Sequence, residues 1–163
     1  MSGRLIGIAV RPGRRQPMRL LEHATVTPEV GVDGDHKGMK LKTRQVTLLA
    51  LEDWQAALAE LDPGQGAVDL LWTARRANLL IEGLELPAAS GAILVVGPVR
   101  IEVTRPVFPC TRMLEAHAGL MRALAKPWRG GIAGRVVAGG EVALGDAVAV
   151  LDAGRPWTRP RLP

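Results

Sequence analysis

Short apolar segments separated by glycine and proline recur along this chain, and this pattern limits the folds open to it. The segments that predict single strands are residues 4–10, 45–50 and 78–81. They are rich in β-branched and aliphatic residues, which suit a pleated, half-buried surface. Many short strands joined by Gly/Pro turns are typical of a β-barrel or a β-sandwich. We therefore expect a mostly β fold.

Two longer segments each predict a β-hairpin. Residues 91–105 contain a turn at Gly97-Pro98, and the arm after the turn alternates apolar and polar side chains. Such alternation indicates a strand with one buried and one solvated face. Residues 132–138 and 141–151 predict a second hairpin, in which Gly139-Gly140 would supply the positive φ angles of a tight turn.

Helical spacing of apolar residues occurs in two places. Residues 51–61 predict one helix, which an Asp-Pro-Gly sequence ends. Residues 114–124 predict a second helix, which ends before Pro127. Two helices are too few to cover both faces of a parallel sheet. We expect them at the periphery of the β-structure.

The composition is that of one globular domain. A chain of 163 residues is long enough to bury a core, and 47% hydrophobic residues exclude disorder. We expect a single domain over residues 1–152 and a basic, proline-rich, extended tail over residues 153–163. One cysteine excludes an internal disulfide and is consistent with a reducing compartment. No apolar stretch is long enough for a signal peptide or a membrane span, so we expect a cytoplasmic protein without a membrane partner.

The charge points to an anionic ligand. The net charge is +5 and most of the cations are arginines, which form bidentate hydrogen bonds with phosphate and carboxylate. Base stacking needs exposed aromatic rings, and the chain has no Tyr, one Phe and four Trp. A small phosphorylated molecule is therefore favoured over nucleic acid. The alternative is that the charge only keeps the surface soluble.

Four polar stretches carry candidate ligand-binding residues. In GVDGDHKG, residues 31–38, three glycines predict a turn whose amides can bind an anion, with Asp35 and His36 as ligand contacts or a proton relay. The alternative is that the aspartates only cap nearby backbone N–H groups. The remaining candidates, which precede or lie on strands, are Arg44, Arg75, Arg76, Asn78 and Arg135. They suit a phosphate, although exposed arginines are also common on protein surfaces.

The only cysteine, Cys110, ends the sequence RPVFPC after a predicted strand. A lone cysteine is commonly an inert, buried residue. Here, however, it lies in a proline-framed loop between Arg105 and Arg112, and cationic neighbours favour the thiolate form of a cysteine. A thiolate is a nucleophile and a soft metal ligand. His36 could act as its base, although sequence spacing does not show that the two meet.

In order and spacing, these stretches resemble the MOSC domain, the C-terminal domain of molybdenum cofactor sulfurases that also occurs as a stand-alone bacterial protein. The matching stretches are GVDGDHKG (31–38), RQVTLL (44–49), RRANLLIEGLEL (75–86), GPVRIEVTRPVFPC (97–110) and GGIAGRVVAGGEVALGD (130–146). The resemblance implies a MOSC-type β-barrel with a few peripheral helices. It also implies a site for the pterin-based molybdenum cofactor.

The resemblance assigns a role to several of the candidates. Cys110 matches the family's cysteine, which is thought to ligate molybdenum or to carry sulfur. The positive loops would meet the phosphorylated pterin, through residues Arg75, Arg76 and Asn78 and through Arg44 and Arg135. The chain departs from the family where many members have Gly-Glu-Asn, because Ala77 replaces the glutamate. It departs again at Val107, where many members have a basic residue.

Three functions are compatible with the sequence. The first is a molybdenum-cofactor-dependent oxidoreductase that acts on N-hydroxylated compounds, with Cys110 as the metal ligand and a separate electron-donor protein. The second is a sulfur carrier or transferase that holds a persulfide on Cys110, supplied by a cysteine desulfurase. The chain has no room for the desulfurase domain of the fused sulfurases, so we expect no pyridoxal phosphate in it. The third is a non-catalytic basic binding module.

Overall fold

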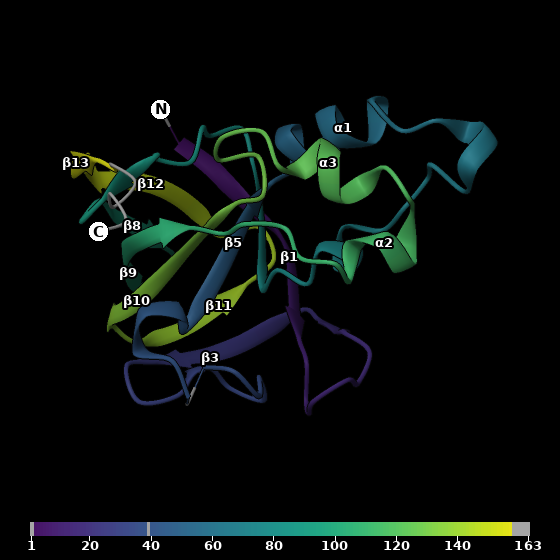
Figure 1. Ribbon diagram of the computed structural model, residues 1–163. Coiled ribbons are helices and arrows are strands. Elements are labelled where there is room, and N and C mark those ends of the chain that lie inside the picture. The colour runs from purple at the N-terminus through teal and green to yellow at the C-terminus, as the bar shows by residue number, and fades with distance from the viewer. Residues whose placement is uncertain (1, 39, 158–163) are drawn as a thin grey trace, which may run out of the picture.

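The computed structural model describes residues 2–38 and 40–157, and most of them form a closed β-barrel (Figure 1). The barrel strands, in spatial order, are β12 (Ala147–Asp152), β8 (Ile93–Val96), β9 (Val99–Pro106), β10 (Ile132–Ala138), β5 (Val46–Ala50), β6 (Leu79–Glu82) and β1 (Ser2–Val10). Pairing of β1 with β12 closes the ring. The expectation of a mostly β barrel with few helices is confirmed.

The long strand β1 closes the barrel because it pairs with β6 along one edge and with β12 along the other. Residues 2–4 pair with β12, and residues 8–10 pair with β2 (Arg19–Leu21). Strands β5 and β6 are parallel neighbours, and helix α1 (Leu51–Ala59) connects their ends. The other barrel pairs are antiparallel.

Two small sheets accompany the barrel. One contains β11 (Gly140–Ala143), β3 (His23–Thr27) and β4 (Gly31–Val32). The other pairs β7 (Ala89–Ser90) with β13 (Arg155–Pro156), so that the first part of the predicted tail is a short edge strand. The rest of that tail, residues 158–163, lies outside the described residues.

The hairpin at Gly97-Pro98 is present as β8 and β9, but the second predicted hairpin is wrong. Strand β10 pairs with β5 and β9, whereas residues 141–151 divide into β11, which pairs with β3, and β12, which pairs with β8 and β1. Gly139 and Gly140 do not have positive φ angles. They instead allow close packing, because a Cβ on either would lie 2.7 Å from an atom of Val26 or Pro98.

The predicted helix over residues 51–61 is α1, but the one over 114–124 is broken into α2 (Met113–Ala116) and α3 (Leu120–Leu124). The break is at His117, which is buried and has an extended backbone (φ −162°, ψ 140°). Its Nδ1 accepts the N–H of Gly119, so its Nε2 donates to the carbonyl of Asp62 at 2.9 Å. The imidazole thus ties the α2–α3 corner to the end of α1.

Two hydrophobic cores share the barrel wall. Leu48 and Ile81 point into the barrel, whereas Leu49 and Leu80, beside them in the same strands, pack against the helices. Alternating side chains point to opposite faces of a strand, so a strand buried on both faces is continuously apolar. The second core includes Met113, which follows Cys110 by three residues, and it therefore anchors the chain just beyond the cysteine. Among the described residues, no helix is long and apolar enough to span a membrane.

Candidate functional site

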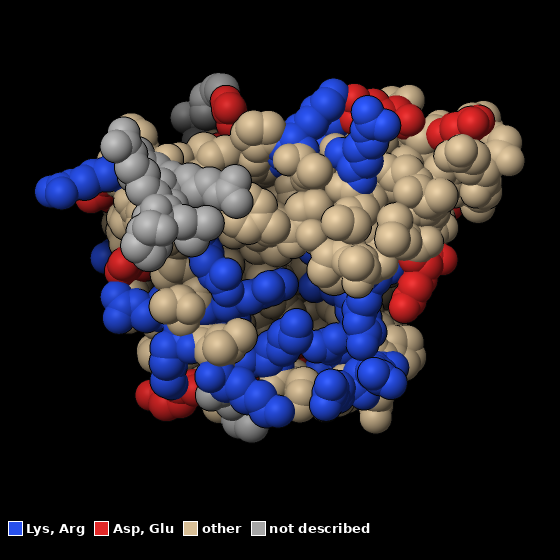
Figure 2. All heavy atoms as spheres, in the orientation of Figure 1, with Lys and Arg blue, Asp and Glu red and all other residues tan. Residues whose placement is uncertain are grey.

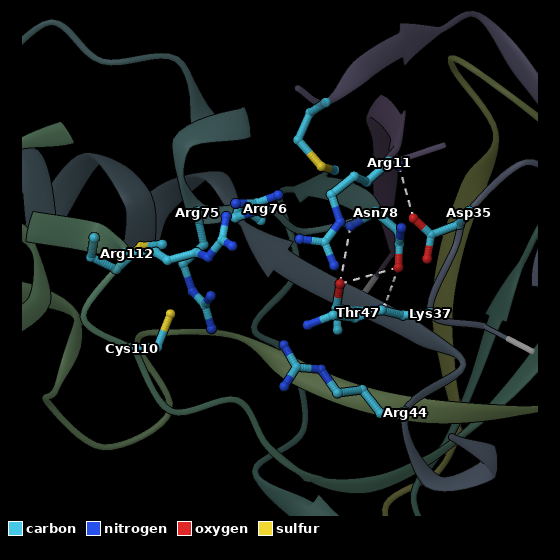
Figure 3. A pocket seen from close by; sticks show the side chains of 12 residues that line it. Arg11, Asp35, Lys37, Arg44, Thr47, Arg75, Arg76, Asn78, Cys110 and Arg112 are labelled. Atoms are coloured by element: carbon cyan, nitrogen blue, oxygen red, sulfur yellow. Dashed lines mark hydrogen bonds between the residues drawn. The ribbon is translucent and has the colours of Figure 1, made fainter. Parts of the chain in front are cut away.

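A cavity of about 140 Å³ lies among the segments that follow β1 and β9 and those that precede β5 and β6 (Figure 3). On the space-filling view, Lys and Arg side chains gather around a hollow on this face (Figure 2). The residues that line the cavity are Arg11, Met18, Asp35, Lys37, Arg44, Thr47, Arg75, Arg76, Asn78, Cys110, Arg112 and Met113. Six of the predicted site residues are therefore brought together: Asp35, Arg44, Arg75, Arg76, Asn78 and Cys110.

Within the part of the chain that the structure describes, the cations of this cavity form no ion pairs with carboxylates. Five arginines and Lys37 share the lining with one carboxylate, that of Asp35. Asp35 itself accepts the backbone N–H of Arg11 at 2.9 Å. The ion pairs found among residues 2–38 and 40–157 involve none of the lining cations. The cavity thus concentrates positive charge that the described part of the protein does not neutralise.

The pKa shifts of the cations in the lining reflect the same excess of positive charge. Burial, and then the charge of Arg105, lower the pKa of Arg44. Burial followed by repulsion from neighbouring arginines likewise lowers the pKa values of Lys37 and Arg76. A thiolate at Cys110 raises the pKa of each of these three groups, so they lie close enough to feel its charge. An anion in the cavity would relieve the same repulsion.

Arg75 positions the cysteine loop rather than extending into solvent. Its side chain is buried, its Nε donates to the carbonyl of Gly130 at 2.9 Å and its Nη2 to that of Val107 at 3.4 Å. Burial, followed by the charge of Arg44, lowers its pKa to about 10. Gly130 allows this contact, since a Cβ there would lie 2.4 Å from the carbonyl oxygen of Val107. The guanidinium therefore joins the loop before Cys110 to the glycine loop before β10.

Asn78 connects three barrel strands at the floor of the cavity. Its Oδ1 accepts the N–H of Thr47 at 3.0 Å and the hydroxyl of Thr47 at 3.2 Å. Its Nδ2 donates to the carbonyl of Ala9 at 3.1 Å. Because both the oxygen and the nitrogen of its side-chain amide are hydrogen-bonded, Asn78 holds β1, β5 and β6 together and so shapes the floor of the cavity.

The GVDGDHKG turn closes one side of the cavity by pairing with the end of β1. The carboxylate of Asp35 accepts the N–H of Arg11, and the N–H of His36 donates to the carbonyl of Arg11 at 2.8 Å. The imidazole of His36 does not line the cavity and lies 3.4 Å from the ammonium of Lys40. The structure therefore does not bring His36 and Cys110 together around the cavity.

Cys110 is exposed and lies at the edge of the cavity, on the side where Arg75 and Arg112 lie (Figure 3). Beside it, Arg76 has a left-handed backbone (φ 66°, ψ 30°), a conformation that is costly for a residue with a Cβ and that is enriched at functional sites. Arg135, the remaining predicted site residue, lies outside the cavity lining and pairs with Glu102 at 2.7 Å.

Sequence reasoning missed four polar residues of the lining as ligand contacts: Arg11, Lys37, Thr47 and Arg112. Lys37 lies inside the GVDGDHKG stretch, and Arg112 was recognised only as a neighbour of Cys110. A search for polar residues inside the matched stretches or within two residues of them would have found both. Arg11 carries no such signal, since it belongs to a turn-like RPGRR sequence.

Comparison with known proteins gives one family and several similar structures. The model of the MOSC domain matches residues 33–149. No curated protein matches the chain. YuaD from Bacillus subtilis is 15% identical with a TM-score of 0.74, over 91% of this chain and 94% of that one. YiiM from Geobacillus stearothermophilus is 16% identical with a TM-score of 0.70, over 94% and 79%.

YiiM from Escherichia coli is 20% identical with a TM-score of 0.66, over 91% of this chain and 70% of that one. At these identities the similar structures show a shared fold. The family match covers most of the chain, includes the GVDGDHKG turn from residue 33 on, and extends through Cys110 to β12. The chain therefore belongs to the MOSC domain family.

Proposed function

We propose that this protein binds the phosphorylated pterin molybdenum cofactor, with Cys110 as a metal ligand, and reduces N-hydroxylated compounds. The observation that carries the proposal is an exposed thiol at the edge of a cavity whose cations have no carboxylate partners among the described residues. The class of substrate comes from the family resemblance.

The donor set fits such a cofactor. A thiolate is a soft ligand for a transition metal. No group of three or more metal-binding side chains occurs within residues 2–38 and 40–157, so a metal held by Cys110 must bring its other ligands with it. The sulfur atoms of a bound molybdopterin would supply such ligands.

The space also fits when two adjoining cavities are considered together. The cavity at Cys110, at about 140 Å³, is smaller than the roughly 300–1,000 Å³ usual for ligand pockets. A second cavity of about 460 Å³ shares Met18, Arg76 and Arg112 with it. A ligand that reaches from Cys110 past these residues has enough room.

The chain's own residues then have separate tasks. Arg44, Arg76 and Arg112 bind the anionic groups of the ligand through charge-assisted hydrogen bonds. Arg75 and Asn78 fix the loops and strands that shape the cavity. When bound, the cofactor supplies two-electron redox chemistry, in which an N–OH group takes up two electrons and two protons to give N–H and water. A separate donor protein supplies the electrons.

The first test is metal and pterin analysis of the protein purified from a host that makes the cofactor. The wild type should contain molybdenum and pterin in near-equal amounts, and Cys110→Ser should lose most of the metal. Arg135→Gln is the matched control, because Arg135 lies outside the cavity lining and should keep both. Wild-type protein free of molybdenum and pterin, with no uptake on reconstitution, would refute the proposal.

The exposure of Cys110 also favours a second candidate, a sulfur carrier. The thiolate would attack the terminal sulfur of a desulfurase persulfide, and the desulfurase thiolate would leave, so that Cys110 holds the sulfur as a persulfide. Intact mass after incubation with a cysteine desulfurase and cysteine should show one added sulfur in the wild type and none in Cys110→Ser. An unchanged wild-type mass would exclude this candidate.

A further inference from the structure

The indole of Trp157 contacts both loops that surround Cys110. Its ring centroid lies 6.2 Å from that of Phe108 and 6.0 Å from that of Trp128, the second pair being edge to face. Both distances are within the range of favourable aromatic pairs. Phe108 precedes Cys110 by two residues, and Trp128 precedes Gly130 by two. Trp157 also lies beyond residue 149, where the match to the family model ends.

The loops that Trp157 contacts are the two that Arg75 already joins. Arg75 donates to the carbonyl of Val107 in one loop and to that of Gly130 in the other. The guanidinium of Arg75 therefore connects the two loops at the cavity. The aromatic cluster of Trp157, Phe108 and Trp128 connects them a second time. Trp128 has a left-handed backbone (φ 62°), which tertiary contacts must maintain in a residue with a Cβ.

The position of Trp157 is fixed by the residues before it. The carboxylate of Asp152 accepts the N–H of Gly154 at 2.9 Å. Gly154 has a φ of +66°, and a Cβ there would lie 2.4 Å from the backbone nitrogen of Ala92, so only glycine fits. Strand β13 then pairs with β7, immediately before Trp157. Trp157 thus follows a segment that is anchored to the barrel.

We propose that Trp157 is a positioning residue that holds the Cys110 loop beside the cationic cavity. Without the indole, Phe108 loses this aromatic contact. The two loops are then joined by Arg75 and by the hydrogen bond from the N–H of Val107 to the carbonyl of Gly131 at 3.0 Å. The thiol then spends less time near Arg44, Arg75 and Arg76. This proposal goes beyond the function proposed above, because it applies whether Cys110 ligates a metal, carries sulfur or does neither.

The charge selectivity of thiol alkylation reports the position of Cys110. Since Cys110 is the only cysteine, alkylation of the full chain measures this thiol alone. Iodoacetate is an anion and iodoacetamide is neutral, so nearby cations accelerate the first reagent relative to the second. A loop that only becomes more accessible reacts faster with both. The ratio of the two rate constants therefore separates position from exposure.

The experiment compares the wild type with Trp157→Ala and Gly154→Ala, each produced in a host without molybdopterin synthesis so that the thiol is free. We expect the iodoacetate-to-iodoacetamide ratio to fall roughly threefold or more in both variants. Trp157→Phe should restore most of the ratio, since a phenyl ring can still pack on Phe108. Arg155→Gln, which removes an exposed tail charge but keeps the β13 pairing, should leave the ratio unchanged.

An unchanged ratio in both Trp157→Ala and Gly154→Ala would overturn the proposal, as would equal acceleration of both reagents. Gly154→Ala displaces Trp157 without removing it, so the two variants test one contact in independent ways. Neither measurement depends on a cofactor. A failed alkylation test would therefore not refute the proposed function, which the metal and pterin analysis tests separately.

Discussion

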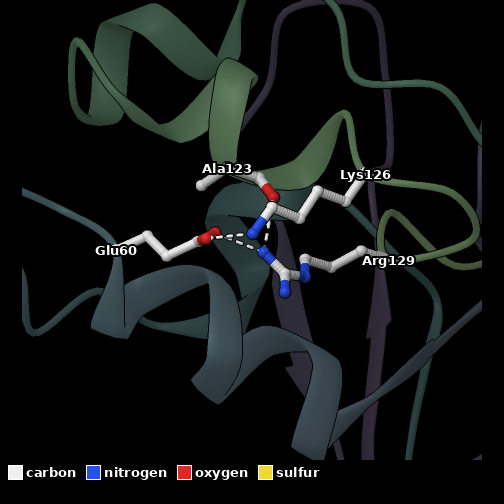
Figure 4. A network of polar contacts seen from close by, with 4 residues as sticks. All are labelled: Glu60, Ala123, Lys126 and Arg129. Atoms are coloured by element: carbon white, nitrogen blue, oxygen red, sulfur yellow. Dashed lines mark hydrogen bonds and ion pairs between the residues drawn. The ribbon is translucent and has the colours of Figure 1, made fainter.

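Two groups of cations in this molecule are built in opposite ways. At the end of α1, the carboxylate of Glu60 forms ion pairs with both Lys126 and Arg129, and Arg129 also donates to the carbonyl of Ala123 at 3.1 Å (Figure 4). Around Cys110, five arginines and a lysine share one carboxylate, which is engaged with a backbone N–H (Figure 3).

The pKa shifts of the two groups differ accordingly. The hydrogen bond from Lys126 is the main cause that lowers the pKa of Glu60, so the first group favours its charged form. Burial and neighbouring cations lower the pKa of Arg44, so the surroundings of Arg44 in the cavity disfavour its charged form. The comparison teaches that the number of cations does not identify a binding site. Missing carboxylate partners distinguish the candidate site from the structural cluster at Glu60.

The largest expected effect concerns Arg75. It lines the cavity, but its guanidinium is hydrogen-bonded to two backbone carbonyls. Arg75→Met removes the donors to the carbonyls of Gly130 and Val107 and leaves both oxygens without that partner. The free energy of unfolding should fall by about 2 kcal/mol, the usual result of leaving buried polar groups unpaired. Urea denaturation measures it. A loss below about 0.5 kcal/mol would show that Arg75 does not hold these loops.

Arg44 should behave in the opposite way. Its folded-state pKa is lowered, so its positive charge destabilises the fold at every pH below that value, including neutral pH. Arg44→Gln should therefore raise the free energy of unfolding by about 0.5 kcal/mol, a small figure because solvent screens a half-buried group. The gain should shrink at high salt. Destabilisation by Arg44→Gln at low salt would contradict the idea of uncompensated charge.

The smallest effect is expected at Glu60. Its folded-state pKa lies below the ordinary value of 4.5, so its contribution to stability is present above pH 4.5 and is lost as the pH falls through the folded-state pKa. Glu60→Gln should lower the melting temperature slightly at pH 7 and not at acidic pH. Thermal melts at the two pH values check this. A difference that grows toward acidic pH would show that the cluster is not an ion-pair network.

Local patterns predicted the strands well and their partners less well. The apolar runs at residues 4–10, 45–50 and 78–81 appear as β1, β5 and β6. Gly139-Gly140, by contrast, has the sequence of a hairpin turn, but its glycines are required by close packing on Val26 and Pro98. Such packing is a tertiary property, and one sequence does not show it.

The candidate site was predictable to a similar degree. The stretches that contain Asp35, Arg75 and Cys110 do meet, in agreement with their order in the family. The task of Arg75 was not predictable, because its hydrogen bonds go to carbonyls 32 and 55 residues away in the chain. The contacts of Trp157 were hidden for the same reason, since Phe108 and Trp128 are distant from it in sequence.

The most direct test of the central claim is calorimetric titration of the cofactor-free protein with pyrophosphate at low salt. The claim is that the cavity at Cys110 binds an anion and the Glu60 cluster does not. We predict one binding site for pyrophosphate in the wild type. Arg44→Gln should reduce the affinity about tenfold, because it removes a charge-assisted hydrogen bond. Glu60→Gln should leave the affinity unchanged. Equal affinity in the wild type and Arg44→Gln, or a loss confined to Glu60→Gln, would contradict the account.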